Sequence, residues 1–219
     1  MRLFTDLVVP LHCVSCGAED DGDLCRRCAE QVVVLCPPWC ERCGARPPCT
    51  CDRLEGFARA RSLVVFAEPS RSLTLRLKRR GATAVATAIG SLMGALARRE
   101  GLEGDTVTFV PGGRAAQRRG FDHAELVARA VARELGVPMV PLLRRAEEGP
   151  RQADVALERR RSNVRRRFAA RPTASSVLLV DDVFTTGATA EACASALRRA
   201  GAPCVDVVTW ARTLLRGHM

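Results

Sequence analysis

The chain has 219 residues, of which 47% are apolar and 26% are charged. This length and apolar content can bury one ordinary domain, with or without a small appendage, which excludes intrinsic disorder as the main state. No apolar run reaches the roughly 18 residues that a membrane helix requires, and the first ten residues lack the flanks of a secretory signal, so we expect a cytoplasmic protein without a transmembrane segment.

The net charge of +10 is concentrated in one part of the chain. Lys78 is the single lysine among 34 basic residues, and such an arginine bias is also what a coding preference would produce. Residues 111–172, however, hold 15 basic and 7 acidic side chains, a surplus that supplies most of the net charge. Local basicity of this kind is typical of a surface that binds a polyanion.

Nine of the 11 cysteines lie between residues 13 and 51. Three Cys-x-x-Cys pairs and one Cys-x-Cys pair could fill two tetrahedral metal sites with four thiolates each, and a set without an open position favours structural zinc. A disulfide scaffold would need an oxidising compartment. Sequential and interleaved sites fit the spacings equally well, and Cys36 could replace a member of the last pair. The expected ligands are Cys13, Cys16, Cys25, Cys28, Cys40, Cys43, Cys49 and Cys51.

From residue 60 onward, short apolar runs alternate with stretches of helical period, which predicts a parallel α/β sheet covered by helices on both faces. We expect a cysteine-rich module over residues 1–56 and the α/β domain over 57–219. The predicted strands are 62–67, 106–110, 138–142, 177–181 and 204–210. The predicted helices are 82–99, with Ile89, Leu92, Met93 and Leu96 as its core face, 124–135 and 189–200.

The segment 143–171 breaks this alternation because it holds ten arginines and little apolar content. A connection of this length and composition between two strands is more often functional or mobile than packed.

Residues 177–189 read Val-Leu-Leu-Val-Asp-Asp-Val-Phe-Thr-Thr-Gly-Ala-Thr, a buried strand followed by a hydroxyl-rich turn that opens a helix. Carboxylates at the carboxyl end of a parallel strand can accept hydrogen bonds from ribose hydroxyls. The turn directs backbone N–H groups at an anion beside the positive end of the helix dipole. A capped helix after a solvated acidic pair is the alternative, but the pattern as a whole favours a sugar phosphate.

This string closely resembles the phosphoribosyl-pyrophosphate (PRPP) signature of the type I phosphoribosyltransferases. The resemblance implies that Asp181 and Asp182 are the catalytic acids that bind the ribose hydroxyls. It also implies that the turn binds the 5-phosphate through Thr185, Thr186, Gly187, Ala188 and Thr189.

The resemblance extends to the ComF family of competence proteins over essentially the whole chain. It is carried by the cysteine pairs, by Leu-Lys-Arg-Arg-Gly at 77–81, by Arg-Gly-Phe at 119–121, by Arg-Gln at 151–152 and by Asn-Val at 163–164 with Phe168. The implied fold is the type I phosphoribosyltransferase fold with an N-terminal zinc-binding module. The implied pyrophosphate loop comprises Pro111, Gly112, Gly113 and Arg114.

The chain departs from the family in two places, and one of them is the loop after Pro111, which is one residue short. Asp122 and His123 stand where the family usually has Asn-Gln. We expect His123 to be a surface or capping residue, because it starts a helix whose next turn is apolar.

The family resemblance implies Mg²⁺-dependent phosphoribosyl transfer to an acceptor that the sequence does not identify. Lys78, Arg114, Arg118 and Arg119 supply cations for the polyphosphate. A protein that binds single-stranded DNA and keeps the fold without turnover is the alternative, and a PRPP-binding regulator is a third. Partners would be PRPP, single-stranded DNA and other competence proteins. The arginines expected to grip nucleic acid or to close as a lid are Arg159, Arg160, Arg161, Arg165, Arg166 and Arg167.

Overall fold

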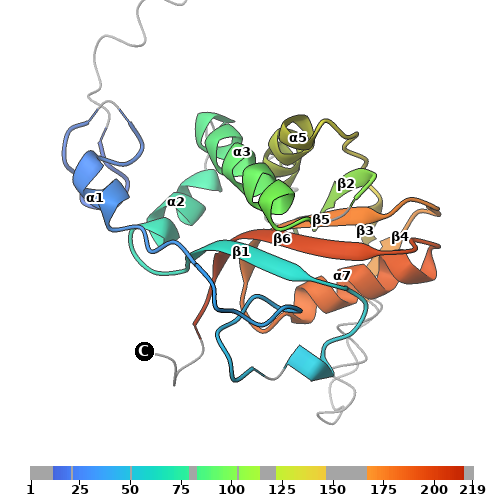
Figure 1. The fold of residues 1–219 in the computed structure, drawn as a ribbon. Coiled ribbons are helices and arrows are strands. Elements are labelled where there is room, and N and C mark those ends of the chain that lie inside the picture. The colour runs from blue at the N-terminus through green and yellow to red at the C-terminus, as the bar shows by residue number, and fades with distance from the viewer. Residues whose placement is uncertain are drawn as a thin grey trace, which may run out of the picture.

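A computed structural model describes residues 12–20, 22–49, 51–78, 83–102, 104–113, 122–146 and 167–214. Its centre is a four-stranded sheet in the order β1, β6, β5, β2, in which all three strand pairs are parallel (Figure 1). The fold class predicted from the sequence is therefore confirmed. The strands are β1 (Ala60–Val65), β2 (Thr106–Phe109), β5 (Val177–Phe184) and β6 (Val205–Arg212).

The inner strands are longer than predicted. β5 continues past the expected end at residue 181 to Phe184, so both acids of the signature belong to the strand itself. The predicted strand at 138–142 is wrong as a full strand. It makes only a parallel bridge between Met139 and Val107, supported by the N–H of Val140, which donates to the carbonyl of Val107 at 2.9 Å.

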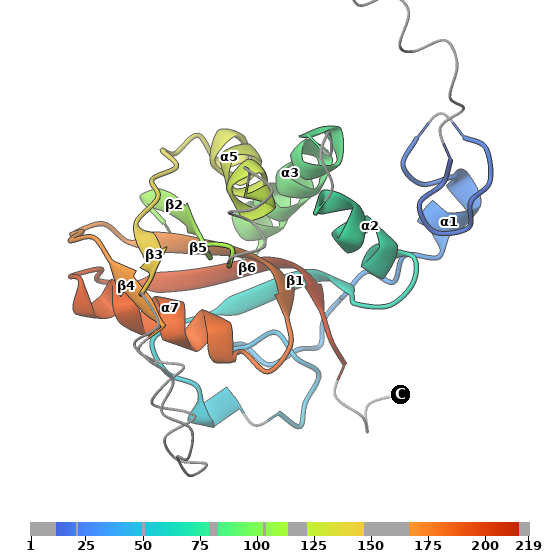
Figure 2. The same ribbon diagram turned by 180° about the vertical axis from the view of Figure 1, so that it is seen from behind.

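Helices cover both faces of the sheet. The helices α2 (Ser70–Leu77), α3 (Thr83–Arg99) and α5 (His123–Leu135) pack on one face, and α7 (Ala188–Arg199) packs on the other (Figures 1 and 2). Because apolar side chains are buried on both sides of β5 and β6, the core forms two layers that the sheet separates.

Two glycines allow α3 and α5 to approach closely. A Cβ on Gly90 would lie 2.4 Å from the Cβ of Ala130, and one on Gly94 would lie 2.6 Å from the Cβ of Glu134. These glycines, which weaken the helix prediction by propensity, are thus required by packing. The predicted core face of α3 is confirmed at its other positions but wrong at Leu92, which is 53% exposed.

A small antiparallel ribbon frames the arginine-rich segment. β3 (Leu143–Arg145) pairs with β4 (Phe168–Ala170), and the N–H of Ala146 donates to the carbonyl of Arg167 at 2.9 Å. The two ends that flank the segment therefore lie side by side. Residues 147–166 lie outside the described part of the chain.

The cysteine-rich segment holds the short helix α1 (Arg26–Glu30) and the single 3₁₀ turn η1 (Cys51–Arg53). Between them, Val34 forms an antiparallel bridge with Val64, which places this stretch along the outer edge of β1. In the described residues, no helix is long and apolar enough to cross a membrane.

Candidate functional site

The acidic pair Asp181–Asp182 lies near the carboxyl end of β5. The four residues before it are fully buried, whereas the two acids are partly exposed. Because β2 and β5 are parallel neighbours, the loop that follows Val110 leaves the sheet at the same edge, and the N–H of Val110 donates to the carbonyl of Val180 at 3.0 Å. The predicted ribose acids and the predicted pyrophosphate loop are thus brought together.

Asp182 is held by two cationic or polar partners. The Nζ of Lys78 and the Nε2 of His123 each lie 3.2 Å from its Oδ2. Burial raises the pKa of Asp182, but the hydrogen bond from His123 and the positive charge of Lys78 outweigh burial and lower this pKa overall. Asp182 is therefore ionised at neutral pH.

His123 is the residue whose position the sequence predicts wrongly. It is only 7% exposed, its Nε2 faces Asp182, and its buried Nδ1 has no hydrogen-bond partner among the residues that the structure describes. The capping role belongs to Asp122, whose Oδ1 accepts from the N–H of Ala124 at 3.0 Å. The departure from the family motif at these two positions was the one available signal.

Asp181 has the opposite electrostatic environment. Burial is the main cause that raises the pKa of Asp181 well above its usual value, and the neighbouring charge of Asp182 adds to it. Its Oδ1 accepts from the N–H of Asp182 at 2.9 Å. Two adjacent carboxyl groups with shifts in opposite directions can share one proton, as closely coupled pairs do.

The turn after β5, for which phosphate binding is predicted, is built around a tightly packed glycine. Gly187 caps α7 in the left-handed conformation (φ 80°), and a Cβ there would lie 2.7 Å from the Cδ1 of Leu54 and 2.8 Å from the Cζ of Phe184. Thr185, Thr186 and Thr189 remain exposed around it. A shallow pocket at this turn is lined by Asp181, Val183, Phe184, Thr185, Gly187, Thr189 and Ala190.

The loop after β2 is tied to the start of α5. The N–H of Gly112 donates to the Oδ2 of Asp122 at 2.6 Å, and the Nε of Arg145 donates to the carbonyl of Pro111 at 3.0 Å. Asp122 and His123 thus connect the loop to the acidic pair. Gly113 belongs to the described loop, whereas Arg114, Arg118 and Arg119 lie outside the described residues.

Most of the predicted lid arginines also fall outside the described residues. Arg167 is described and exposed, and it precedes β4. The positions outside are Arg159, Arg160, Arg161, Arg165 and Arg166.

The cysteines form two sequential clusters rather than interleaved ones. The first comprises Cys13, Cys16, Cys25 and Cys28, and the second comprises Cys40, Cys43, Cys49 and Cys51; within each, all Sγ atoms lie within 4.8 Å of one another. Cys36 belongs to neither. All eleven cysteines are described, and none of them forms a disulfide.

The geometry of both clusters fits zinc. Tetrahedral ligands with Zn–S bonds of about 2.3 Å place their sulfurs roughly 3.8 Å apart. The Sγ atoms of Cys16 and Cys25 are 3.7 Å apart, and that of Cys51 is 3.5 Å from those of Cys40 and Cys49. Four thiolates leave no open position, so a zinc ion here would have a structural role.

Backbone N–H groups already stabilise one thiolate in each cluster. Burial raises the pKa of Cys13, but hydrogen bonds from backbone N–H groups outweigh it and lower this pKa to about 6. The same balance lowers the pKa of Cys40 to about 6. Burial and hydrogen bonding with the side chains of Cys16, Cys13 and Cys25 raise the pKa of Cys28 to about 12.

The second cluster is joined to the sheet. Arg212, at the end of β6, donates to the carbonyl of Cys43 and lies over the ring of Phe184, 4.2 Å from its centre. On β1, the Nη1 of Arg61 donates to the carbonyl of Glu41 at 2.8 Å. The first cluster contacts α2 through an ion pair of 3.0 Å between Arg76 and Asp23.

Comparison with known proteins agrees with this architecture. The phosphoribosyl transferase domain family matches residues 122–215, which include the acidic pair and the turn. The DNA utilization protein YhgH of Salmonella typhimurium (strain LT2) is 30% identical over 204 residues, covering 87% of this chain and 89% of the relative. The chain belongs to this ComF-like family. YhgH of Salmonella typhi is 29% identical over 210 residues, again covering 87% and 89%.

Solved structures of phosphoribosyltransferases are more distant from this ComF-like chain. Glutamine PRPP amidotransferase from B. subtilis, complexed with ADP and GMP, is 27% identical over 57% of this chain, with a TM-score of 0.41. This chain spans 26% of the length of that enzyme. Adenine phosphoribosyltransferase from Leishmania tarentolae is 20% identical over 57% of this chain and 54% of its own, with a TM-score of 0.33.

Proposed function

We propose that this protein binds PRPP with Mg²⁺ and transfers its phosphoribosyl group to an acceptor within DNA utilization. The observation that carries the proposal is the pair Asp181–Asp182 at the edge of the sheet, followed at once by an anion-binding turn and flanked by the loop that Asp122 holds. The matching domain family supports PRPP as the ligand, and the name of the Salmonella relatives supports the link to DNA.

In this proposal each group of residues binds a different part of PRPP. Asp181 and Asp182 accept hydrogen bonds from the ribose hydroxyls, and the turn at 185–189 donates to the 5-phosphate. The loop at Gly112 lies where pyrophosphate would leave. The two carboxylates also suit Mg²⁺, which prefers oxygen ligands and would neutralise charge on the departing pyrophosphate.

The chemical step requires positioning more than acid–base work. The nucleophile forms a bond to the anomeric carbon, the bond from that carbon to pyrophosphate breaks, and pyrophosphate keeps the electron pair. Asp182, fixed by Lys78 and His123, orients the ribose for this displacement. The nucleophile loses its proton to solvent or to a nearby base.

Binding of single-stranded DNA is the second candidate function. The arginine-rich segment begins and ends at the ribbon of β3 and β4, and Arg145 of this ribbon contacts the loop at Pro111. The segment is therefore anchored beside the proposed PRPP site. Its arginines are suited to bind phosphate groups, either of DNA or of PRPP.

A thermal-shift titration with PRPP and Mg²⁺ tests the main proposal, because a ligand that binds the native state raises the melting temperature. The double variant Asp181→Ala, Asp182→Ala should lose the shift. The matched control removes two exposed carboxylates, Glu30→Ala and Glu68→Ala, and should keep it. An equal shift in both variants would place the ribose elsewhere.

Turnover is tested separately by release of pyrophosphate from PRPP in the presence of candidate acceptors. Nucleobases, amines and single-stranded DNA are the acceptor classes to compare. Release that depends on an acceptor and is lost in the double variant supports transfer. A full thermal shift without any acceptor-dependent release would favour a binding or regulatory role.

A further inference from the structure

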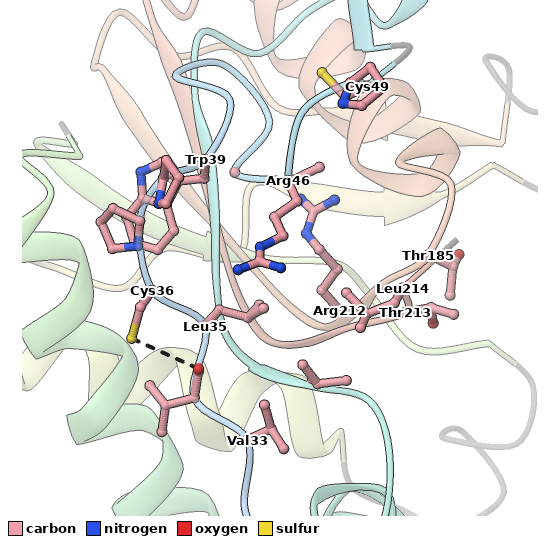
Figure 3. A pocket seen from close by; sticks show the side chains of 17 residues that line it. Val33, Leu35, Cys36, Trp39, Arg46, Cys49, Thr185, Arg212, Thr213 and Leu214 are labelled. Atoms are coloured by element: carbon pink, nitrogen blue, oxygen red, sulfur yellow. Dashed lines mark hydrogen bonds between the residues drawn. The ribbon is translucent and has the colours of Figure 1, made fainter. Parts of the chain in front are cut away.

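A cavity of about 340 Å³ lies between the second cysteine cluster and the carboxyl ends of β1 and β6 (Figure 3). One wall is the stretch from Val33 to Trp39, and another is the loop that carries Arg46 and Cys49. Thr185 of the anion-binding turn also lines it. The cavity therefore adjoins the turn of the proposed PRPP site.

Two arginines give the cavity its charge. Arg46 and Arg212 both line it, and none of the residues that line it is acidic. Arg46 is exposed and forms no ion pair within the described part of the chain. Arg212 is only 6% exposed, and its guanidinium donates to the carbonyl of Cys43 and lies over the ring of Phe184, while its Nε has no hydrogen-bond partner within the described residues. Arg46 therefore presents the free positive charge to the cavity, and together with the partly paired Arg212 beside it this charge favours an anion.

The rest of the lining is mostly apolar and holds one indole ring and several prolines. Trp39, Pro37 and Pro38 form one side, and Val33 and Leu214 remain exposed despite their apolar side chains. The guanidinium of Arg61 lies over the ring of Trp39, 5.2 Å from its centre, which fixes the indole in place. Such a surface suits a flat, weakly polar group rather than a second charge.

We propose that this cavity binds a nucleotide, with the base against Trp39 and the prolines and the phosphate on Arg46 and Arg212. An inorganic anion would leave the apolar side in water, and an uncharged aromatic group would leave the charge of Arg46 without a partner. A nucleotide covers the apolar side with its base and pairs its phosphate with the arginines. The occupant would be a free nucleotide or the terminal nucleotide of single-stranded DNA, which share this chemistry.

The inference does not require phosphoribosyl transfer. The site is separate from Asp181 and Asp182 and shares only Thr185 with the turn. The double alanine variant of the two acids should therefore lose the PRPP shift while it keeps nucleotide binding. Loss of both in that variant would assign the nucleotide to the PRPP site and overturn this inference.

Tryptophan fluorescence provides a direct measurement, because the chain has two tryptophans and Trp210 is only 4% exposed. Titration with dAMP should quench the emission of Trp39, and Trp39→Phe should remove that change. Deoxyadenosine and inorganic phosphate should each bind at least about tenfold more weakly than dAMP, because each lacks half of the recognised group. Equal binding of phosphate and dAMP would overturn the nucleotide assignment.

Arg46→Ala isolates the charge on a side chain that makes no described hydrogen bond. It should weaken dAMP binding by about tenfold or more, the loss of one charge-assisted contact to phosphate. Arg27→Ala removes an equally exposed arginine from the first cysteine segment and should leave the affinity unchanged. Equal affinities of the two variants would contradict the proposal.

The source of the nucleotide is distinguished with a 5′-phosphorylated oligothymidine and the same strand without its phosphate. A terminal nucleotide of DNA predicts that the phosphorylated strand competes with dAMP and that its advantage disappears in Arg46→Ala. Competition by dAMP alone, without competition by either strand, assigns the cavity to free nucleotides. Failure of dAMP and both strands to bind would overturn the inference.

Discussion

Two isosteric substitutions at neighbouring residues should change the stability of the free protein in opposite directions. Asp181→Asn removes a carboxyl group whose charge is disfavoured by burial and by Asp182. Asp182→Asn removes a carboxylate whose Oδ2 lies 3.2 Å from both the Nε2 of His123 and the Nζ of Lys78. Both substitutions keep the shape of the side chain. Both should abolish the thermal shift by PRPP, because an amide cannot replace the acceptor pair.

The magnitudes follow from the exposure of the partners. A hydrogen bond to a charged group contributes about 1.5–3 kcal/mol, and this applies to the buried His123. The Lys78 side chain is 41% exposed, so its ion pair adds only about 0–1 kcal/mol. The substitution also removes the free-energy cost of burying the Asp182 charge, which offsets part of this loss. We expect Asp182→Asn to destabilise the protein by about 1–3 kcal/mol, which lowers Tm by roughly 2–4 °C per kcal/mol.

Asp181→Asn should stabilise the free protein by about 0.5–2 kcal/mol, as removal of a functional but unfavourable group commonly does. The effect should depend on pH. The folded protein holds the proton of Asp181 more tightly than the unfolded chain, so stability falls as pH rises from its usual pKa of 3.8 toward the raised value. The substitution removes this fall, and its advantage should therefore grow with pH.

Asp182→Asn should show the opposite dependence. Its lowered pKa stabilises the folded protein above the unfolded pKa, and this contribution is lost as pH falls. The deficit of the variant should therefore shrink in acid. Denaturant unfolding of the wild type and both variants, from pH 8 down to below the unfolded aspartate pKa of 3.8, provides the measurement. Shifts in the same direction for both variants at pH 8 would refute the assigned electrostatics.

Three further predictions concern the metal clusters, the DNA contact and the turn. Metal analysis should find two zinc ions per chain, and Cys43→Ser should lower Tm more than Cys16→Ser, because the second cluster contacts the sheet. Alanine at all three arginines of 165–167 should reduce the steepness with which the logarithm of the single-stranded DNA binding constant falls with the logarithm of salt concentration, by roughly 0.7 per lost phosphate contact, as measured by anisotropy. If the segment is a lid, PRPP should suppress DNA binding. Gly187→Ala should weaken PRPP binding and lower Tm more than Gly136→Ala, which shares the left-handed backbone (φ 74°) but has no atom within 4 Å of the added Cβ.

The fold was largely predictable because its strands and helices carry strong periodic patterns. The apolar run at 177–180 has no polar residue, and a strand buried on both faces requires such a run. The prediction of a full strand at 138–142 was wrong. A short apolar stretch indicates an extended chain, but it does not show whether the neighbouring strand has a free edge long enough to pair with it. The prediction that Leu92 is buried was wrong because the face of α3 that carries Gly90 and Gly94 packs against α5. The division of the chain at residue 56 stays a prediction.

The candidate site was predictable only where residues are adjacent in the sequence. The acidic pair and the turn at 185–189 form one continuous motif, and their roles in PRPP binding stay predictions. The grouping of cysteines needed the structure, because equal spacings allow both pairings. The contact of His123 with Asp182 joins positions 59 apart, and no local pattern reports such a distance.

The cysteine-rich segment and the α/β domain are coupled through the residues that shape the turn. Arg212 joins the carbonyl of Cys43 to the ring of Phe184, and Leu54 together with that ring leaves no room for a Cβ at Gly187. The second cluster therefore supports the turn from one side, while His123 and Lys78 fix the acids from the other. Metal in the second cluster is for this reason expected to act on the turn at 185–189 through packing, whereas the described contact of the first cluster is the ion pair between Asp23 and Arg76 of α2, away from that turn.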